Sequence, residues 1–239
     1  MKALRDGSLG TAFPTVVGVG HSYGSVVTAE VAGLDHDAYD AIITTGFTHL
    51  LNYANAFGRI IPHDYLAAGD EKFAGLNLDP LYVTSQPGTR GVFQHGPNTH
   101  PSLPAIDEST LKDTSSLVKA ATVLTYSVPN SNHTLDVPTL VVNGDREPFF
   151  CGLQSATCTS EQALLDHERR WYAPGAPVEA YVVPGTGHDD ERAAVGCGQV
   201  PGLLEPHVVA RAVDEPDRRP DGAQALHRPA AGHRHRSAR

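Results

Sequence analysis

The sequence predicts an α/β fold in which a mostly parallel β-sheet is flanked by helices. Four short runs of apolar and β-branched residues, near Val16, Ile42, Leu140 and Val182, have the near-continuous hydrophobicity of parallel strands buried on both faces. Helical patterns follow the first and the third run, as the crossovers of a parallel sheet require. With 239 residues and 40% hydrophobic content, the chain is long enough to bury one sizeable core.

The first predicted strand ends in Gly20-His21-Ser22-Tyr23-Gly24, and a helical pattern continues from there to Gly33. A serine hydroxyl is a weak nucleophile and must stand clear of the backbone for a base to reach its proton. We expect Ser22 to be strained on this sharp turn. We expect the neighbouring chain to pass close to Gly20 and Gly24, so that only glycine fits at these two positions. The helix that follows directs free N–H groups at the same place.

The second predicted strand is Ala41–Gly46, and a long interval without regular alternation of strands and helices follows it. Helical patterns occur within this interval at Thr48–Phe57 and Asp107–Leu124, the latter with Asp107 or Ser109 as N-cap. The loops between them are rich in Gly, Pro and Asn. Loops of this length inside a compact domain are usually functional.

The third predicted strand, Val137–Gly144, runs directly into an acidic loop, Asp145–Cys151. A helix is expected from its N-cap at about Ser160 to Trp171. The fourth predicted strand is Val178–Val183, and the loop that leaves it is Pro184-Gly185-Thr186-Gly187-His188. A nucleophilic turn and a histidine loop therefore both follow predicted strands.

The Gly20–Gly24 turn and the Gly-x-Gly-His loop ending at His188 resemble the nucleophile elbow and histidine loop of the α/β-hydrolase superfamily of serine esterases and lipases. The resemblance implies a partial α/β-hydrolase fold in which Ser22 is the nucleophile and His188 the general base. It also implies that the Tyr23 N–H donates to an oxyanion, with His21 beside the substrate.

In the resembled fold, the interval at about 47–136 is a lid insertion over the nucleophile. Ordinary core packing is the stronger explanation for any single aromatic residue of this interval. Together, however, six of them would line an acyl pocket: Phe47, Tyr53, Phe57, Tyr65, Tyr82 and Phe93.

Two carboxylates compete for the role of the acid that orients His188. Asp145 and Glu147 lie two residues apart on one loop, and only one of them can point at the imidazole. The usual superfamily pattern after this strand is Gly-x-x-Asp, which places the acid at Glu147, three residues past Gly144. We therefore favour Glu147 and keep Asp145 as the alternative acid.

The resemblance divides the chain into an α/β-hydrolase domain at 1–189 and an atypical tail at 190–239. In the superfamily, roughly a hundred residues precede the elbow strand, so we expect the N-terminal strands of the sheet to be missing here. The tail accumulates Arg, Ala, Pro and His, and no aromatic residue occurs in 184–239. We expect it to be largely disordered.

The composition limits the partners. A net charge of −9 and a pI near 5.7 argue against nucleic acid and anionic membranes. No apolar run approaches the ~20 residues of a membrane span. The first seven residues lack the apolar core of a secretory signal, and the compartment stays open: cytoplasmic, or secreted if an upstream segment is missing.

Three cysteines match no common zinc pattern, and no metal or organic cofactor is expected. Cys151 and Cys158 either form a local disulfide or remain free thiols.

Together these patterns predict a serine hydrolase that cleaves carboxylic esters of small molecules through an acyl-enzyme on Ser22. An acyltransferase or a perhydrolase could use the same triad. The alternative from another class is a non-catalytic hydrolase fragment or binding module. The expected lack of upstream strands favours that alternative, whereas the set of Ser22, His188 and a nearby acid favours the enzyme.

Overall fold

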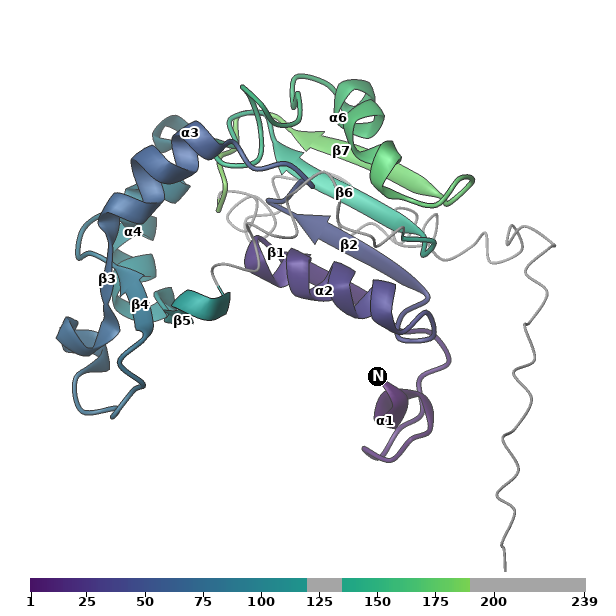
Figure 1. Ribbon diagram of the computed structural model, residues 1–239, viewed down its shortest axis with the longest axis horizontal. Helices are drawn as coiled ribbons and strands as arrows, with labels where there is room; N and C mark the ends of the chain where they lie inside the picture. The colour runs from purple at the N-terminus through teal and green to yellow at the C-terminus, as the bar shows by residue number, and fades with distance from the viewer. Residues whose placement is uncertain (120–134, 190–239) are drawn as a thin grey trace, which may run out of the picture.

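The computed structural model describes residues 1–119 and 135–189, and within them a parallel sheet forms the centre of the protein (Figure 1). Its strands follow the order β1-β2-β6-β7, and each adjacent pair is parallel. They are β1 (Val17–His21), β2 (Ala41–Thr45), β6 (Thr139–Gly144) and β7 (Val178–Val183). The four predicted strands and the α/β fold class are confirmed. The predicted tail, 190–239, lies outside the described residues.

The carboxyl ends of the four strands meet at one edge of the sheet because the strands are parallel. β6 lies inside the sheet, and all six of its residues are buried. The loops that leave β1, β6 and β7 at this edge carry Ser22, Glu147 and His188, respectively. The topology therefore gathers the predicted site residues at one place.

Two helices contribute to one large core with the sheet. These are α2 (Tyr23–Leu34) and α6 (Glu161–Glu168), and the buried members of the core include Val26, Ala29, Ile42, Val141 and Leu164. Because successive strand residues point to opposite faces, a smaller cluster lies on the other face, made of Ile43, Leu140, Val142 and Val183. A short helix, α1 (Lys2–Arg5), precedes the sheet.

The start of α6 agrees with the prediction. The Ser160 hydroxyl accepts the Ala163 N–H at 3.2 Å, which confirms Ser160 as the N-cap. A 3₁₀ turn, η8 (Arg169–Trp171), continues the helix to the predicted end at Trp171.

Between β2 and β6, residues 46–119 form what we call the intervening segment, which lies beyond the carboxyl ends of the central strands (Figure 1). It contains an antiparallel sheet of order β3-β4-β5, with β3 (Asp64–Leu66), β4 (Tyr82–Ser85) and β5 (Ser115–Ser116). Its helical pieces are α3 (Tyr53–Asn55), η1 (Ala56–Ile60), η2 (Ile61–His63), η3 (Ala67–Gly69), η4 (Glu71–Phe73), η5 (Arg90–Phe93), η6 (Gly96–Asn98), α4 (Leu103–Ile106) and η7 (Asp107–Leu111).

The predicted helix at Thr48–Phe57 is wrong at its start. The buried Thr48 hydroxyl donates to the carbonyl oxygens of Leu50 and Phe150, both at 2.9 Å. This side-chain bonding competes with helical hydrogen bonds, and the helix begins only at Tyr53.

The predicted helix at Asp107–Leu124 is also misplaced. A first helical stretch runs from Leu103 to Leu111, β5 interrupts the predicted range, and helical residues resume at 117–119; residues 120–124 lie outside the described part. Neither candidate N-cap caps it. The Asp107 carboxylate accepts two hydrogen bonds from the Arg90 guanidinium, at 2.8 and 2.9 Å, and the Ser109 hydroxyl donates to a backbone carbonyl four residues earlier.

Among the described helices, none combines the length and the hydrophobicity that crossing a bilayer requires.

Candidate active site

Ser22 occupies the sharp turn between β1 and α2. Its φ of 51° and ψ of −119° are strained for a residue with a side chain, as the sequence predicted. The Ser22 N–H donates to the Thr45 carbonyl oxygen at 2.9 Å, so the end of β2 holds the turn in place. A Cβ at position 20 would lie 2.4 Å from the Gly24 carbonyl oxygen, which explains why Gly20 is a glycine.

The expectation of crowding at Gly24 is wrong for the described part of the chain. A Cβ at this position would meet no atom within 4 Å. The backbone of Gly24 is the obstacle for Gly20, and Gly24 itself has room for a side chain.

Three side chains from three strand ends meet at this turn. Ser22 Oγ lies 2.8 Å from His188 Nε2, and His188 Nδ1 lies 2.7 Å from Glu147 Oε2. A carboxylate only accepts hydrogen bonds, so Nδ1–H donates to Glu147 and Nε2 of the neutral ring accepts the serine hydroxyl. Glu147 and His188 are both buried. This arrangement can accept a proton from Ser22 and stabilise the imidazolium that results.

The two candidate acids have different partners. Besides His188, Glu147 accepts two backbone N–H groups from residues 149–150 with Oε1, at 2.7 and 3.3 Å, and these fix its carboxylate. Asp145 Oδ1 instead accepts the Gly185 N–H at 2.7 Å and so joins the loop after β6 to the loop after β7. The structure brings Glu147, the favoured acid, to His188.

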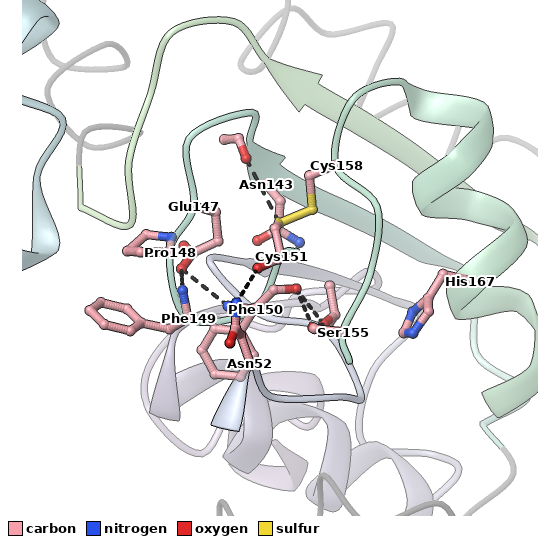
Figure 2. The surroundings of a disulfide bond; sticks show 12 residues. Asn52, Asn143, Glu147, Pro148, Phe149, Phe150, Cys151, Ser155, Cys158 and His167 are labelled. Carbon is pink, nitrogen blue, oxygen red and sulfur yellow. Dashed lines mark hydrogen bonds between the residues drawn. A yellow bond between two sulfur atoms is a disulfide. The ribbon is translucent and has the colours of Figure 1, made fainter. Parts of the chain in front are cut away.

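A disulfide closes the loop that follows Glu147 (Figure 2). The sequence left open whether Cys151 and Cys158 are bonded, and the structure contains the bridge, with the Cα atoms 5.7 Å apart. The Asn52 side chain donates to the Cys151 carbonyl oxygen at 2.9 Å. The bridged loop is therefore tied to the start of the intervening segment.

Aromatic rings surround His188. The ring centroids of Phe93, Phe149 and Phe150 lie 5.8, 5.3 and 5.9 Å from that of His188. These apolar neighbours lower the local dielectric and thereby strengthen the hydrogen bonds of the imidazole.

The aromatic residues predicted to line an acyl pocket have different positions. Phe93 lies beside His188, whereas Phe47 is buried in the large core. Phe57 is exposed, and the Tyr65 hydroxyl donates to Asp70 at 2.6 Å. A shared acyl pocket stays a prediction.

Tyr23 and His21 flank the nucleophile. Tyr23 is the first residue of α2, so its N–H lies at the helix N-terminus. The His21 ring has Nδ1 2.9 Å from Thr45 Oγ1 and Nε2 3.0 Å from Asp189 Oδ1. The oxyanion and substrate-binding roles of these two residues stay predictions.

Two charged residues near the site were not found from the sequence, Asp189 and Arg90. Burial alone would raise the pKa of Asp189, but its hydrogen bond with His21 and the charges of His188, His21 and Arg90 lower this pKa to about 2. Asp189 is therefore anionic at neutral pH. Its place directly after His188 was a usable signal, whereas nothing in the sequence pointed to Arg90.

In the described part of the chain, one group of side chains is close enough to hold a metal ion. Potential ligand atoms of His21, His188 and Asp189 lie within 4.8 Å of one another. His188 Nε2 faces Ser22 Oγ, and His21 Nε2 faces the Asp189 carboxylate. These hydrogen bonds explain the cluster without an ion.

No protein-family model and no curated protein matches the chain. Among solved structures, it is similar to E-2-(acetamidomethylene)succinate hydrolase, at 17% identity over 83% of this chain and 66% of that one, with a TM-score of 0.45. It is also similar to a monoacylglycerol lipase from Paleococcus ferrophilus, at 13% identity over 83% and 70%, with a TM-score of 0.44. An α/β-hydrolase fold protein from Chitinophaga pinensis matches at 14% identity over 76% and 62%, also with a TM-score of 0.44.

The chain thus spans about two thirds of the lengths of these three structures. Many of the matching structures are esterases, lipases and other hydrolases of the α/β-hydrolase fold, at low identity and TM-score. The described chain has the mostly parallel central sheet with flanking helices that is typical of that fold.

Proposed function

We propose that this chain is a serine hydrolase that cleaves carboxylic esters through an acyl-enzyme on Ser22. The observation that carries the proposal is the hydrogen-bonded series from Ser22 through His188 to Glu147, with distances of 2.8 and 2.7 Å. It begins on a strained turn at the N-terminus of α2, where N–H groups face developing negative charge. Hydrolase enzymes among the similar structures agree with hydrolysis in general but do not indicate an ester.

The reaction follows from the roles of these groups. His188 accepts the hydroxyl proton while Ser22 Oγ attacks the ester carbonyl carbon, and Glu147 stabilises the imidazolium. The Tyr23 N–H donates to the oxyanion of the tetrahedral intermediate. His188 then gives its proton to the leaving alkoxide as the C–O bond breaks. A water molecule attacks the acyl-enzyme by the same steps and releases the acid.

The test compares Ser22→Ala with Ser109→Ala, which removes an exposed hydroxyl from the intervening segment. We expect Ser22→Ala to abolish p-nitrophenyl ester turnover and fluorophosphonate labelling, and Ser109→Ala to leave both unchanged. Labelling that persists in Ser22→Ala would refute the assignment of the nucleophile.

Product analysis tests the other candidate functions. Transfer to an added alcohol or to hydrogen peroxide in preference to water would favour the acyltransferase or perhydrolase. A folded wild-type chain without turnover or labelling would favour the non-catalytic alternative.

A further inference from the structure

The residues that flank Ser22 and His188 in the sequence are paired with each other. His21 directly precedes Ser22 at the end of β1, and Asp189 directly follows His188. His21 Nε2 lies 3.0 Å from Asp189 Oδ1, and both side chains are about 15% exposed. A second His–carboxylate pair therefore connects the two loops that carry the proposed nucleophile and base.

The His21 ring is held at both nitrogens. Its Nε2–H donates to Asp189, and Nδ1 of the neutral ring accepts the Thr45 hydroxyl at 2.9 Å. A Cβ at Gly46, the next residue, would lie 2.8 Å from His21 Cε1. The ring fills a space that only a glycine at position 46 leaves open, so its orientation is fixed.

Asp189 is also held by the intervening segment. Its N–H donates to the Phe93 carbonyl oxygen at 2.8 Å, and its Oδ2 lies 3.7 Å from the Arg90 guanidinium. Arg90 is itself bound to Asp107 and lies over the ring of Phe93, 4.5 Å from its centroid. Backbone and side-chain contacts together fix where the Asp189 carboxylate lies.

We propose that His21 and Asp189 are positioning residues that act as a clasp between the elbow and the histidine loop. The clasp keeps Ser22 Oγ within hydrogen-bond distance of His188, and the nearby charge of Asp189 stabilises the imidazolium of His188. The expected effect of the clasp on catalysis rests on the proposed function, whereas its expected effect on the protonation of His188 is independent of that function.

The charges around His188 determine the sign of this effect. Negative charge on Glu147 and Asp189 favours the imidazolium, whereas a protonated His21, with its ring centroid 5.0 Å away, would disfavour it. Arg90 also disfavours it, but Asp107 binds its guanidinium and offsets its charge. Removing the charge of Asp189 should therefore lower the pKa of His188.

Three variants separate charge from geometry. Asp189→Asn removes the charge and keeps the shape, Asp189→Glu keeps the charge and displaces it, and His21→Gln removes the ring that completes the clasp. The matched controls are Asp136→Asn and His36→Gln, because His36 and Asp136 form an exposed pair with the same 3.0 Å geometry.

The first readout is NMR titration of the His188 imidazole in the full chain, which needs no activity. We expect Asp189→Asn to lower the His188 pKa by about one unit, and Asp189→Glu to keep it near the wild-type value. The second readout is p-nitrophenyl ester turnover. We expect kcat to fall ~10- to 100-fold in all three variants, with KM nearly unchanged. In His21→Gln and Asp189→Glu the cause is a small displacement of the reacting groups, whereas in Asp189→Asn it is the loss of negative charge beside the imidazolium.

Of the three variants, only Asp189→Asn should shift the acidic limb of the pH profile of kcat/KM to lower pH. A role in folding alone would reduce activity without moving that limb. Wild-type His188 pKa and wild-type kcat in Asp189→Asn would overturn the proposal. If Asp189→Asn does not fold, unchanged kcat in both His21→Gln and Asp189→Glu would overturn it equally. An inactive wild-type chain whose His188 pKa still falls in Asp189→Asn would refute the proposed function and keep the charge effect.

Discussion

The central sheet and the intervening segment are stabilised by different interactions. In the sheet, β6 is fully buried, and both faces pack apolar side chains, such as Val141 on one face and Val142 on the other. In the intervening segment, the buried contacts include charged groups, with Lys112 Nζ 2.6 Å from both Asp70 and Glu108. Many of its large apolar side chains are exposed, among them Phe57, Ile61, Leu66, Leu76, Leu81, Ile106 and Leu111.

This difference has a consequence for the site. Apolar burial has no required direction, and a well-packed sheet keeps strand ends in place. Buried ion pairs depend on each partner, and removing one leaves an uncompensated charge. Changes at the strand ends should therefore act on reaction rates, and changes within the intervening segment should act on its own stability.

The largest effect is expected at a strand end. Glu147→Gln should lower kcat by ~10³- to 10⁴-fold, because the amide neither fixes the histidine tautomer nor stabilises the imidazolium. Asp145→Asn should lower it far less, because Asp145 bonds the Gly185 N–H instead of His188. Stopped-flow and steady-state ester hydrolysis measure both. If Asp145→Asn had the greater effect, Asp145 would be the acid.

A destabilisation confined to the intervening segment is expected from Lys112→Met. Loss of the buried ammonium leaves Asp70 without its charged partner, and we expect a cost of about 3–5 kcal/mol in local stability. Hydrogen exchange should show faster exchange at β3 and β4 and unchanged protection at β6. Lys2→Met, at an exposed position in α1, is the control. Equal loss of protection in β6 would show that the two regions unfold as one unit.

Removal of the disulfide should have a smaller effect. Cys151→Ser or Cys158→Ser opens a short loop, which corresponds to about 2–3 kcal/mol of unfolding free energy. Chemical denaturation with Cys197→Ser as control measures this difference. Because the loop follows Glu147, the double Cys→Ser variant should also lower kcat. Unchanged stability would show that the bridge constrains neither state.

The smallest effect is expected for Glu168, which joins the intervening segment to α6. Glu168 Oε2 lies 2.6 Å from His49 Nδ1, and Oε1 lies 3.0 Å from His167 Nδ1. Burial alone would raise the pKa of Glu168, but the charges and hydrogen bonds of these histidines lower it to about 2.

A carboxyl group whose pKa is lowered by folding stabilises the protein above its unfolded pKa, near 4.5, and this contribution is lost as pH falls towards 2. Glu168→Gln should therefore reduce stability at pH 7 by on the order of 2 kcal/mol and weaken the loss of stability on acidification. Thermal melts between pH 7 and 3 measure this, with Glu161→Gln at the exposed start of α6 as control. Parallel pH curves for wild type and Glu168→Gln would contradict it.

The two regions also differ in how far the sequence predicts them. Buried parallel strands need continuous apolar runs, so β1, β2, β6 and β7 were visible in the sequence. The strands β3 to β5 contain two to four residues each, and their pairing depends on tertiary contacts that no local pattern records. The π-helical turns η1 and η7 likewise have no signature in a 3.6-residue period.

The site shows the same limit. Ser22, Glu147 and His188 each follow a predicted strand at a motif spacing, and the structure brings their side chains together. The clasp partner Asp189 could have been suspected, because it is next to His188. Arg90 comes from the intervening segment, and its approach to Asp189 depends on a turn that the sequence does not specify.

The most direct test of the account is to map where a fluorophosphonate reacts. The full wild-type chain is incubated with the probe, digested, and analysed by tandem mass spectrometry, beside Glu147→Gln. The account predicts a single adduct on Ser22 that forms at least 100-fold more slowly in Glu147→Gln, on the order expected from loss of the orienting carboxylate. An adduct on another residue, or an equal rate in Glu147→Gln, would contradict it.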